Sequence, residues 1–266
     1  MSYDDRAHLR SAVLGDSFLS AGALGGALTL GGLAWSRKYA LDPYLVKLPR
    51  LGYTGSTLSP STVDVYVNDT LVRRVAVDPG EFQLSNITPV TGAGTTRYVL
   101  RDAYGQEQRL ESGYYSSAGV LAQGLSEYAY GIGLVRKDFG KRSFRYGGPA
   151  AMGRHRFGLT DHLTPGAHLE FDASLVNLGT ELTLAGMFGE VELHAAASRG
   201  TTRTARRGVA GILGYSYQRR GTSLRTVVRG TSRSFATLSL GADQHRNSFE
   251  QLTSTSLALG ARTTLS

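Results

Sequence analysis

The period of the hydrophobic pattern is the strongest constraint on the fold of this chain. From Ser112 onward, apolar and polar residues alternate with a period of two, and the clearest stretch runs from Ala167 to Leu175. Ala, Leu and Phe occupy every second position there, and His, Glu, Asp and Ser lie between them. Successive side chains of a β-strand point to opposite faces. The pattern therefore predicts strands with one apolar and one polar face.

The alternation recurs in three further segments, Tyr128 to Leu134, Val191 to Ala195 and Val209 to Tyr217. Short segments with turn-forming composition separate the strands, at 161–166, 177–179, 186–189 and 218–221. Connections this short join antiparallel neighbours. We therefore predict an antiparallel meander.

The chemistry of the two faces favours a transmembrane β-barrel. One face is rich in small residues, Leu and Tyr, as expected against lipid, whereas the other carries carboxylates and Gly, as expected around a water-filled lumen. A soluble sandwich or barrel with one solvated face alternates in the same way and stays an alternative. The residues expected to face lipid are Leu169, Phe171, Val191 and Leu193. Those expected to face the lumen are Glu170, Asp172, Glu190 and Glu192.

The apolar run from Phe18 to Trp35 has nearly the length of a transmembrane helix. It contains five glycines, and each costs about 1 kcal/mol of helix propensity relative to Ala. A pair of glycine-rich strands explains the same residues without that cost. The whole composition agrees with an all-β chain, with 34 Gly and 14 Tyr but only 7 Pro.

The net charge of +8 raises the possibility of a nucleic-acid partner. The arginines between 199 and 233, however, fall mostly at turns or singly between apolar residues, with no basic helix and no interleaved aromatic ladder. We therefore expect no nucleic-acid partner. The chain has no Cys, which excludes disulfides and thiolate chemistry.

The stretch from Pro60 to Glu111 differs from the rest of the chain in its pattern of strands and turns. Three alternating valines, at 63, 65 and 67, are followed by an Asn-Asp turn, more valines and an Asp-Pro-Gly turn. Further short strands and turns follow up to Glu111. This segment carries its own turn chemistry and lies between two glycine-rich strand regions, so we predict a small β-sandwich inserted into the barrel.

Several motifs then occur in an order that resembles the fimbrial usher family. Leu14-Gly15-Asp16 resembles an early strand of the family, and a proline-led strand follows at 49–53. Within 61–105, three stretches resemble the motifs V-x-V-Y-x-N, P-G-x-F and V-x-E-x-D-G of the plug domain. The residues that carry them are Val63, Val65, Tyr66, Asn68, Pro79, Gly80, Phe82, Asp102 and Gly105. Segments 121–130 and 156–164 resemble two barrel motifs, and several matches in order are more specific than one.

The sequence departs from the family pattern at two positions. Arg101 stands where an acidic residue is usual, and Phe157 where Tyr is common. The resemblance implies an all-β fold, a partial antiparallel transmembrane β-barrel with an inserted β-sandwich plug. The implied domains are barrel strands at 1–55, an Ig-like plug at 56–113 and barrel strands at 114–266.

The resemblance also implies a function and a location. An usher is a pore in the outer membrane of Gram-negative bacteria that translocates and assembles pilus subunits delivered by a periplasmic chaperone. The implied partners are therefore pilus subunits, their chaperone and outer-membrane lipid. The signal peptide and periplasmic domains of the family are not visible in the sequence. We therefore expect a piece of an usher that does not assemble pili alone.

The sequence contains no known motif for catalysis, metal binding or nucleotide binding. The histidines His155, His162, His168 and His194 are isolated on strands or turns, so we expect no metal site. Glu170 with Asp172, and Glu190 with Glu192, could mimic a glycosidase pair, but a polar lumen lining explains them better. We expect no cofactor, no small-molecule substrate and no enzyme activity. The alternatives are another outer-membrane porin, or a surface β-sandwich adhesin or carbohydrate-active protein.

Overall fold

The computed structural model describes residues 1–139, 142–201, 207–240, 248–258 and 264–265. These residues form strands with one short 3-10 turn, η1 (Tyr39–Leu41), which confirms the all-β prediction. No helix among them has the length and hydrophobicity needed to cross a membrane. The strands are β1 (Ser2–Asp5), β2 (Arg10–Ser20), β3 (Ala27–Arg37), β4 (Leu51–Thr57), β5 (Ser61–Val67), β6 (Thr70–Val77), β7 (Gly80–Ile87), β8 (Gly92–Asp102), β9 (Glu107–Ser116), β10 (Ser126–Arg136), β11 (Tyr146–Phe157), β12 (Leu163–Asp172), β13 (Leu175–Gly186), β14 (Gly189–Gly200), β15 (Gly208–Arg219), β16 (Thr222–Thr231), β17 (Phe249–Ala258) and β18 (Thr264–Leu265).

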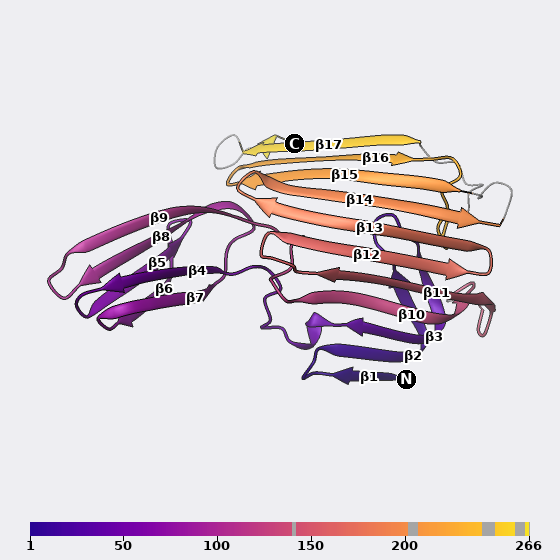
Figure 1. Cartoon of the computed structure of the whole chain (residues 1–266), viewed down its shortest axis with the longest axis horizontal. Helices are drawn as coiled ribbons and strands as arrows, with labels where there is room; N and C mark the ends of the chain where they lie inside the picture. The colour runs from indigo at the N-terminus through magenta and orange to yellow at the C-terminus, as the bar shows by residue number, and fades with distance from the viewer. Residues whose placement is uncertain (140–141, 202–206, 241–247, 259–263, 266) are drawn as a thin grey trace.

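The main sheet is an antiparallel meander in the order β1-β2-β3-β10-β11-β12-β13-β14-β15-β16-β17-β18 (Figure 1). Neighbours in the sheet are neighbours in sequence except at one place, where β3 pairs directly with β10. Among the described residues, no pairing joins β1 to β17 or β18. The meander confirms the predicted antiparallel pairing.

Two of the predicted turns are tight hairpins. β13 and β14 are joined across Gly186 and Gly189, and Gly189 has a φ of +107°. β15 and β16 are joined across Arg219 and Thr222, with Gly221 at a φ of +78°. A positive φ is accessible to Gly without the clash that a Cβ would cause. Glycine therefore lets the chain reverse at both points.

The predicted turn at 177–179 is wrong, because β13 runs without a break from Leu175 to Gly186. The reversal lies earlier, where a carboxylate oxygen of Asp172 accepts hydrogen bonds from the backbone N–H groups of Ser174 and Leu175, both at 2.7 Å. An Asp that binds its own following backbone makes such a turn. Gly179 serves packing instead, since a Cβ there would lie 2.2 Å from a ring atom of His168.

The glycine-rich run from Phe18 to Trp35 forms the end of β2 and most of β3, as predicted, and the helix alternative is wrong. Its glycines allow close approach between strands. A Cβ on Gly32 would lie 2.2 Å from the backbone oxygen of Ile132 on β10. Because Gly32 has no side chain, β3 can lie close to β10, and these two strands flank the inserted strands.

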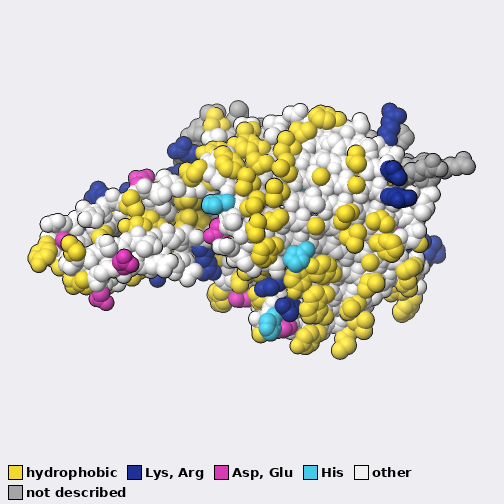
Figure 2. Space-filling view, in the orientation of Figure 1, with side chains coloured by type: hydrophobic (Ala, Val, Ile, Leu, Met, Phe, Trp, Pro, Cys, Tyr) yellow, Lys and Arg dark blue, Asp and Glu magenta, His cyan; other side chains and the backbone are white. Residues whose placement is uncertain are grey.

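The main sheet has an inverted distribution of polarity. On β12, Leu169 and Phe171 are about half exposed, at 49% and 52%, whereas Glu170 between them is completely buried. Figure 2 views the face that carries the exposed apolar side chains, which spread over the sheet while most charged side chains lie near its margins. We call this the outer face and the face that carries Glu170 the inner face. A soluble sheet buries its apolar face, so this sheet is arranged the other way round.

Strands β4 to β9 form the inserted unit, Leu51–Ser116, which lies beside one end of the main sheet (Figure 1). One layer has the order β6-β5-β8-β9 and the other pairs β4 with β7. Val63, Val65 and Val67 are buried in its core, together with Leu84, Ile87, Tyr98 and Tyr114. A β-bridge between Ala93 and Arg219 connects it to β15, and the Tyr115 hydroxyl of β9 donates to the Ser216 carbonyl of β15 at 3.2 Å.

Candidate functional site: the inner face of the main sheet

The inner face of β12, β13 and β14 carries a row of buried polar side chains. The period of two puts all of them on one face of the sheet. They are Thr164, His168, Glu170, Asn177, Glu181, Thr183 and Ser198. A buried polar group needs a hydrogen-bond partner, because its desolvation is otherwise uncompensated. For Glu170, Asn177 and Ser198 the partners lie on segments that fold back over this face.

The hairpin that joins β2 to β3, residues 20–27, is one of these segments. The Glu170 carboxylate accepts hydrogen bonds from the backbone N–H of Gly26 and, at 3.1 Å, from that of Leu238. The Asn177 amide donates to the Leu24 carbonyl at 3.1 Å. The hairpin tip is thus bound to the inner wall through one carboxylate and one amide, and Glu170 connects it to a second segment.

That second segment follows β16 and spans residues 232–240. The backbone N–H of Ala27 donates to the Ser239 hydroxyl at 3.2 Å, and the backbone N–H of Ala236 donates to the Ser198 hydroxyl at 3.0 Å. Phe235 packs with Leu24 in a small apolar cluster. Arg229 donates from its guanidinium to the Ala23 carbonyl at 2.7 Å. The hairpin and this segment therefore form one layer over the inner face.

A second polar cluster surrounds Glu181. Its carboxylate accepts two hydrogen bonds from the Arg154 guanidinium, at 2.9 and 2.7 Å, and Arg156 and His194 lie within 3.8 and 3.7 Å. The paired geometry is the strongest form of this contact. Each oxygen of this carboxylate therefore accepts one hydrogen bond from Arg154. Over the described residues, no group of three or more His, Asp and Glu side chains could hold a metal.

The two segments that connect the inserted unit to the main sheet are also fixed. On the first, the Tyr39 hydroxyl donates to the Ser126 carbonyl at 2.7 Å, and Lys47 lies 3.4 Å from Glu127. On the second, the backbone N–H of Leu121 donates to the Thr164 hydroxyl at 2.9 Å. Arg156 reaches both Glu127, at 3.2 Å, and the Gly119 carbonyl. These bonds set the place where the inserted unit leaves the sheet.

The four carboxylates singled out from the sequence lie at three separate places. Glu170 is buried under the hairpin, and Asp172 holds the turn that follows β12. Glu190 and Glu192 are half-buried beside Arg225 at a cavity of about 560 Å³, which Tyr115 of β9 and Gly119 of the second connecting segment also line. Glu190 and Glu192 therefore lie together at this cavity, whereas Glu170 and Asp172 lie apart from them. Both carboxylate oxygens of Glu170 and one of Asp172 accept hydrogen bonds from the chain.

The motif residues of the inserted unit have structural places. Val63 and Val65 are core, and Phe82 packs 5.9 Å from the Tyr53 ring. Tyr66 lies under the Arg97 guanidinium, at 4.8 Å. The remaining five lie at turns. Asn68 has a φ of +48°, and its side-chain oxygen accepts a hydrogen bond from the Thr95 N–H at 3.0 Å. Gly80 follows Pro79 at the start of β7. Asp102 accepts hydrogen bonds from the N–H groups of Tyr104 and Gln106, and Gly105 in the same turn has a φ of +83°.

An ion pair lies on the layer of the inserted unit that contains β5 and β6. Arg74 donates to Asp64 through two nitrogens, and the Nη2–Oδ2 distance is 2.8 Å. These hydrogen bonds from Arg74 lower the pKa of Asp64 below its ordinary value. Asp64 is buried and Arg74 is exposed, so the pair lies at the edge of the core.

Glu170, which holds the hairpin, lies on the face that the sequence predicts to line the lumen, but the other residues of these polar clusters carry no such signal. Asn177 falls in a stretch that the sequence predicts as a turn, and nothing in the sequence distinguishes Arg154 and Glu181. Their only signal is a charged or amide side chain on the polar face of a strand, which every neighbouring strand also shows.

Comparison with known proteins relates this arrangement to a solved fold. The chain is 26% identical over 222 residues to the outer membrane usher protein FimC of Bordetella pertussis, a match that covers 82% of this chain and 24% of that protein. A solved E. coli P pilus tip assembly intermediate containing PapC, PapD, PapK and PapG matches with a TM-score of 0.69 and 14% identity. The chain resembles part of an outer-membrane usher. No family model matches it.

The usher resemblance extends over nearly all of this chain. The match to the assembly intermediate covers 97% of this chain and 33% of the solved chain. A second structure, the translocation pore of the P pilus usher PapC, matches with a TM-score of 0.53 and 15% identity over 96% of this chain and 53% of that chain. At these identities the structural matches establish the fold. The chain spans about a quarter of the length of the FimC usher.

Proposed function

We propose that this chain forms part of the wall and the gate of an outer-membrane usher, through which chaperone-delivered pilus subunits are translocated and assembled. The observation that carries this proposal is the inverted main sheet, with its apolar side chains exposed and its polar side chains buried under inward-folded segments. The sequence similarity to the FimC usher and the fold shared with PapC support it.

In this proposal the outer face contacts the lipid of the outer membrane. Leu169, Phe171 and Leu193 would face hydrocarbon, and all three are about half exposed. Glu170, Asp172, Glu190 and Glu192 belong to the inner face, which would line the lumen. Within such a wall each strand of the main sheet from β2 to β16 pairs with a neighbour on both sides, as a membrane requires of the strands inside a wall.

The inserted unit is proposed as the plug, with the predicted range 56–113 as its body. Two features support this role. The unit interrupts the meander between β3 and β10, which pair with each other, and its connecting segments are bonded to the inner face. The hairpin at 20–27 would restrict the lumen in addition, because it already covers the inner face beside Glu170. Opening and closing the pore would then require both the inserted unit and the hairpin to move.

We further propose that the chain acts in transport and assembly without catalysis. The carboxylates of Glu170, Asp172 and Glu181 are engaged by backbone N–H groups or arginines. The partners of the usher would be pilus subunits and their chaperone, as in the assembly intermediate that contains PapD, PapK and PapG with PapC.

The membrane placement can be tested with single cysteines, because the chain has none of its own. We expect Phe171→Cys in the outer membrane to resist a water-soluble maleimide and to react with a lipid-soluble one. Ser223→Cys, at the polar cavity of the inner face, should show the opposite preference. Equal labelling of both positions by the water-soluble reagent would contradict the proposal.

The assembly function can be tested in a chimera. The matching segment of the Bordetella FimC usher is replaced with residues 1–266, and surface pili are counted in a strain that lacks its usher. We expect pili, and we expect their loss when the same segment is replaced with strands of a porin. A chimera that folds in the membrane and assembles no pili would contradict the proposed function.

A further inference from the structure

The outer face of β11 lacks large side chains where its neighbours have them. Counted outward from His155, every second residue of this strand is Gly153, Ala151, Pro149 or Gly147. The cross-strand partners of Gly153 are Tyr130 on β10 and Leu169 on β12, and those of Ala151 are Ile132 and Phe171. Cross-strand partners share a face of the sheet. A trough therefore follows β11, with large apolar side chains on both sides.

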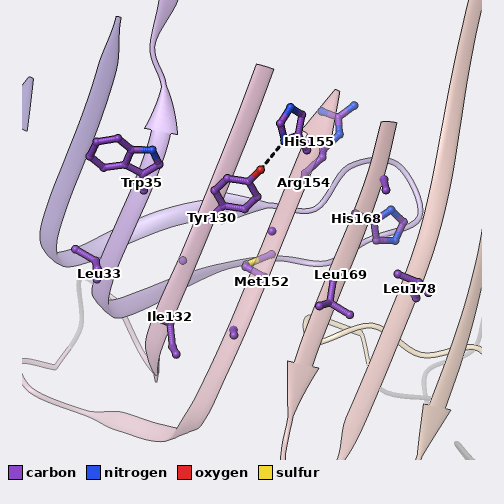
Figure 3. A pocket seen from close by; sticks show the side chains of 14 residues that line it. Leu33, Trp35, Tyr130, Ile132, Met152, Arg154, His155, His168, Leu169 and Leu178 are labelled. Atoms are coloured by element: carbon purple, nitrogen blue, oxygen red, sulfur yellow. Dashed lines mark hydrogen bonds between the residues drawn. The ribbon is translucent and has the colours of Figure 1, made fainter. Parts of the chain in front are cut away.

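The trough contains a groove with a volume of about 490 Å³. Trp35, Leu33, Tyr130 and Ile132 stand on one side of it, and Leu169 and Leu178 stand on the other (Figure 3). The flanking strands β10 and β12 are two positions apart, so their axes are separated by about 10 Å. The groove is therefore long and narrow, which suits an extended chain better than a globular surface.

One end of the groove is polar. The Tyr130 hydroxyl lies 2.6 Å from His155 Nδ1, as the dashed line in Figure 3 marks, and the Tyr128 ring stacks on Tyr130 at 5.4 Å. This bond leaves the exposed imidazole with its other nitrogen, Nε2, for an external group. His155 lies near the end of β11, where Phe157 pairs with Ser126, the first residue after the inserted unit that belongs to the sheet. An apolar groove with a polar end at the border of the sheet matches an amphipathic molecule.

We propose that this groove binds one acyl chain of a glycerophospholipid, with the lipid head group against His155 and Tyr130. The inference rests on the proposed function, because only a lipid-facing outer face presents the groove to hydrocarbon. On the two flanking strands, Tyr130, Ile132, Leu169 and Phe171 are exposed on this face. Along β11 the small residues admit a chain between the strands on either side. The bound lipid would therefore exchange with the bilayer as a ligand does, more slowly than bulk lipids exchange with one another.

Trp35 makes the proposal measurable, since it is the single tryptophan of the chain and lines the groove. The chain is reconstituted in phosphatidylcholine vesicles with an increasing fraction of lipid brominated on its acyl chains, and quenching of Trp35 fluorescence is recorded. We expect quenching to saturate at a low brominated fraction when the quencher enriches in the groove. Ala151→Leu and Ala167→Leu fill the groove and should return quenching to a linear dependence on the bulk fraction.

Ala195→Leu is the matched control, because Ala195 is also a small exposed residue on the outer face, but on β14 and outside the groove. It should behave as the unchanged chain does. Linear quenching that is identical in all four proteins would overturn the bound lipid and leave the membrane placement intact. Absence of quenching at every brominated fraction would overturn the membrane placement itself. Weak quenching with a doubled sedimenting mass would assign the groove to a second copy of the chain and overturn the lipid proposal.

Discussion

The main sheet and the inserted unit follow the same alternation of apolar and polar residues but bury opposite faces. In β5 of the inserted unit, Val63 and Val65 are completely buried. In β12 of the main sheet, Leu169 and Phe171 are about half exposed and Glu170 is completely buried. The period of two sets only which residues share a face. The surroundings of each region decide which face turns inward.

The difference also explains how each region is stabilised. The inserted unit has an apolar core, so transfer of its side chains out of water supports it. The inner face of the main sheet is held by the hydrogen bonds that Glu170 and Asn177 form with the segments that cover them, and by the ion pair between Glu181 and Arg154 of β11. The same kind of substitution should therefore have effects of different size in the two regions.

A charge in the core of the inserted unit should have the largest effect. Val65→Asp leaves an uncompensated buried carboxylate and should destabilise the unit by about 3–5 kcal/mol, while the main sheet stays folded. Val72→Asp, at a half-exposed position on β6, should have little effect. Limited proteolysis reports the outcome, because cleavage should fall within 51–116 in the first variant alone. Protection of the unit in Val65→Asp would show that its core does not hold it.

A charge on the outer face should come next in size. Leu178→Arg should destabilise the chain in lipid by about 2–4 kcal/mol, the cost of Arg on a lipid face near the membrane centre. Leu71→Arg, at a similarly exposed position of the inserted unit, should cost almost nothing. Urea unfolding in vesicles measures both. Equal and small effects would mean that the outer face is in water, and the contrast between the two regions would fail.

Loss of the carboxylate under the hairpin should have a smaller effect. Glu170→Gln replaces one of the two oxygens that accept from Gly26 and Leu238 with an amide donor, so one buried N–H loses its acceptor. An unsatisfied buried group costs about 1–3 kcal/mol. Hydrogen exchange should rise in residues 20–27, whereas Glu250→Gln, on exposed β17, should leave it unchanged. An unchanged hairpin in Glu170→Gln would show that other contacts hold it.

The smallest effect concerns pH and the Asp64–Arg74 pair. The folded pKa of Asp64 lies below its unfolded value of about 3.9. The pair therefore contributes its full stability above that pH, and the contribution is lost as the pH falls through the folded pKa. The effect should be small because Arg74 is exposed and water screens it. The melting temperature of the unit can be recorded by near-UV circular dichroism of the stacked Tyr53–Tyr98 pair. As the pH is lowered, this temperature should fall less steeply in Asp64→Asn than in the unchanged chain.

Several parts of the fold could be predicted because they depend on local chemistry. The alternation at Ala167 to Leu175 predicted β12, and glycines at 186, 189 and 221 marked two hairpins. The same reasoning failed at 177–179, where an Asn and a Gly lie inside β13. Composition alone does not distinguish a turn from a strand in which the Asn177 amide donates to the Leu24 carbonyl and Gly179 leaves room for the His168 ring.

The sequence by itself determined the strands, their faces and the segment that interrupts them, because these follow from the period of two and from turn-forming residues. The tertiary structure alone decided that β3 pairs with β10 across the inserted unit, that residues 20–27 fold onto Glu170, and that the outer face of β11 is a groove. Each of these depends on residues far apart in the chain. Their contacts form only when curvature and register bring distant strands together, and no local pattern records that geometry.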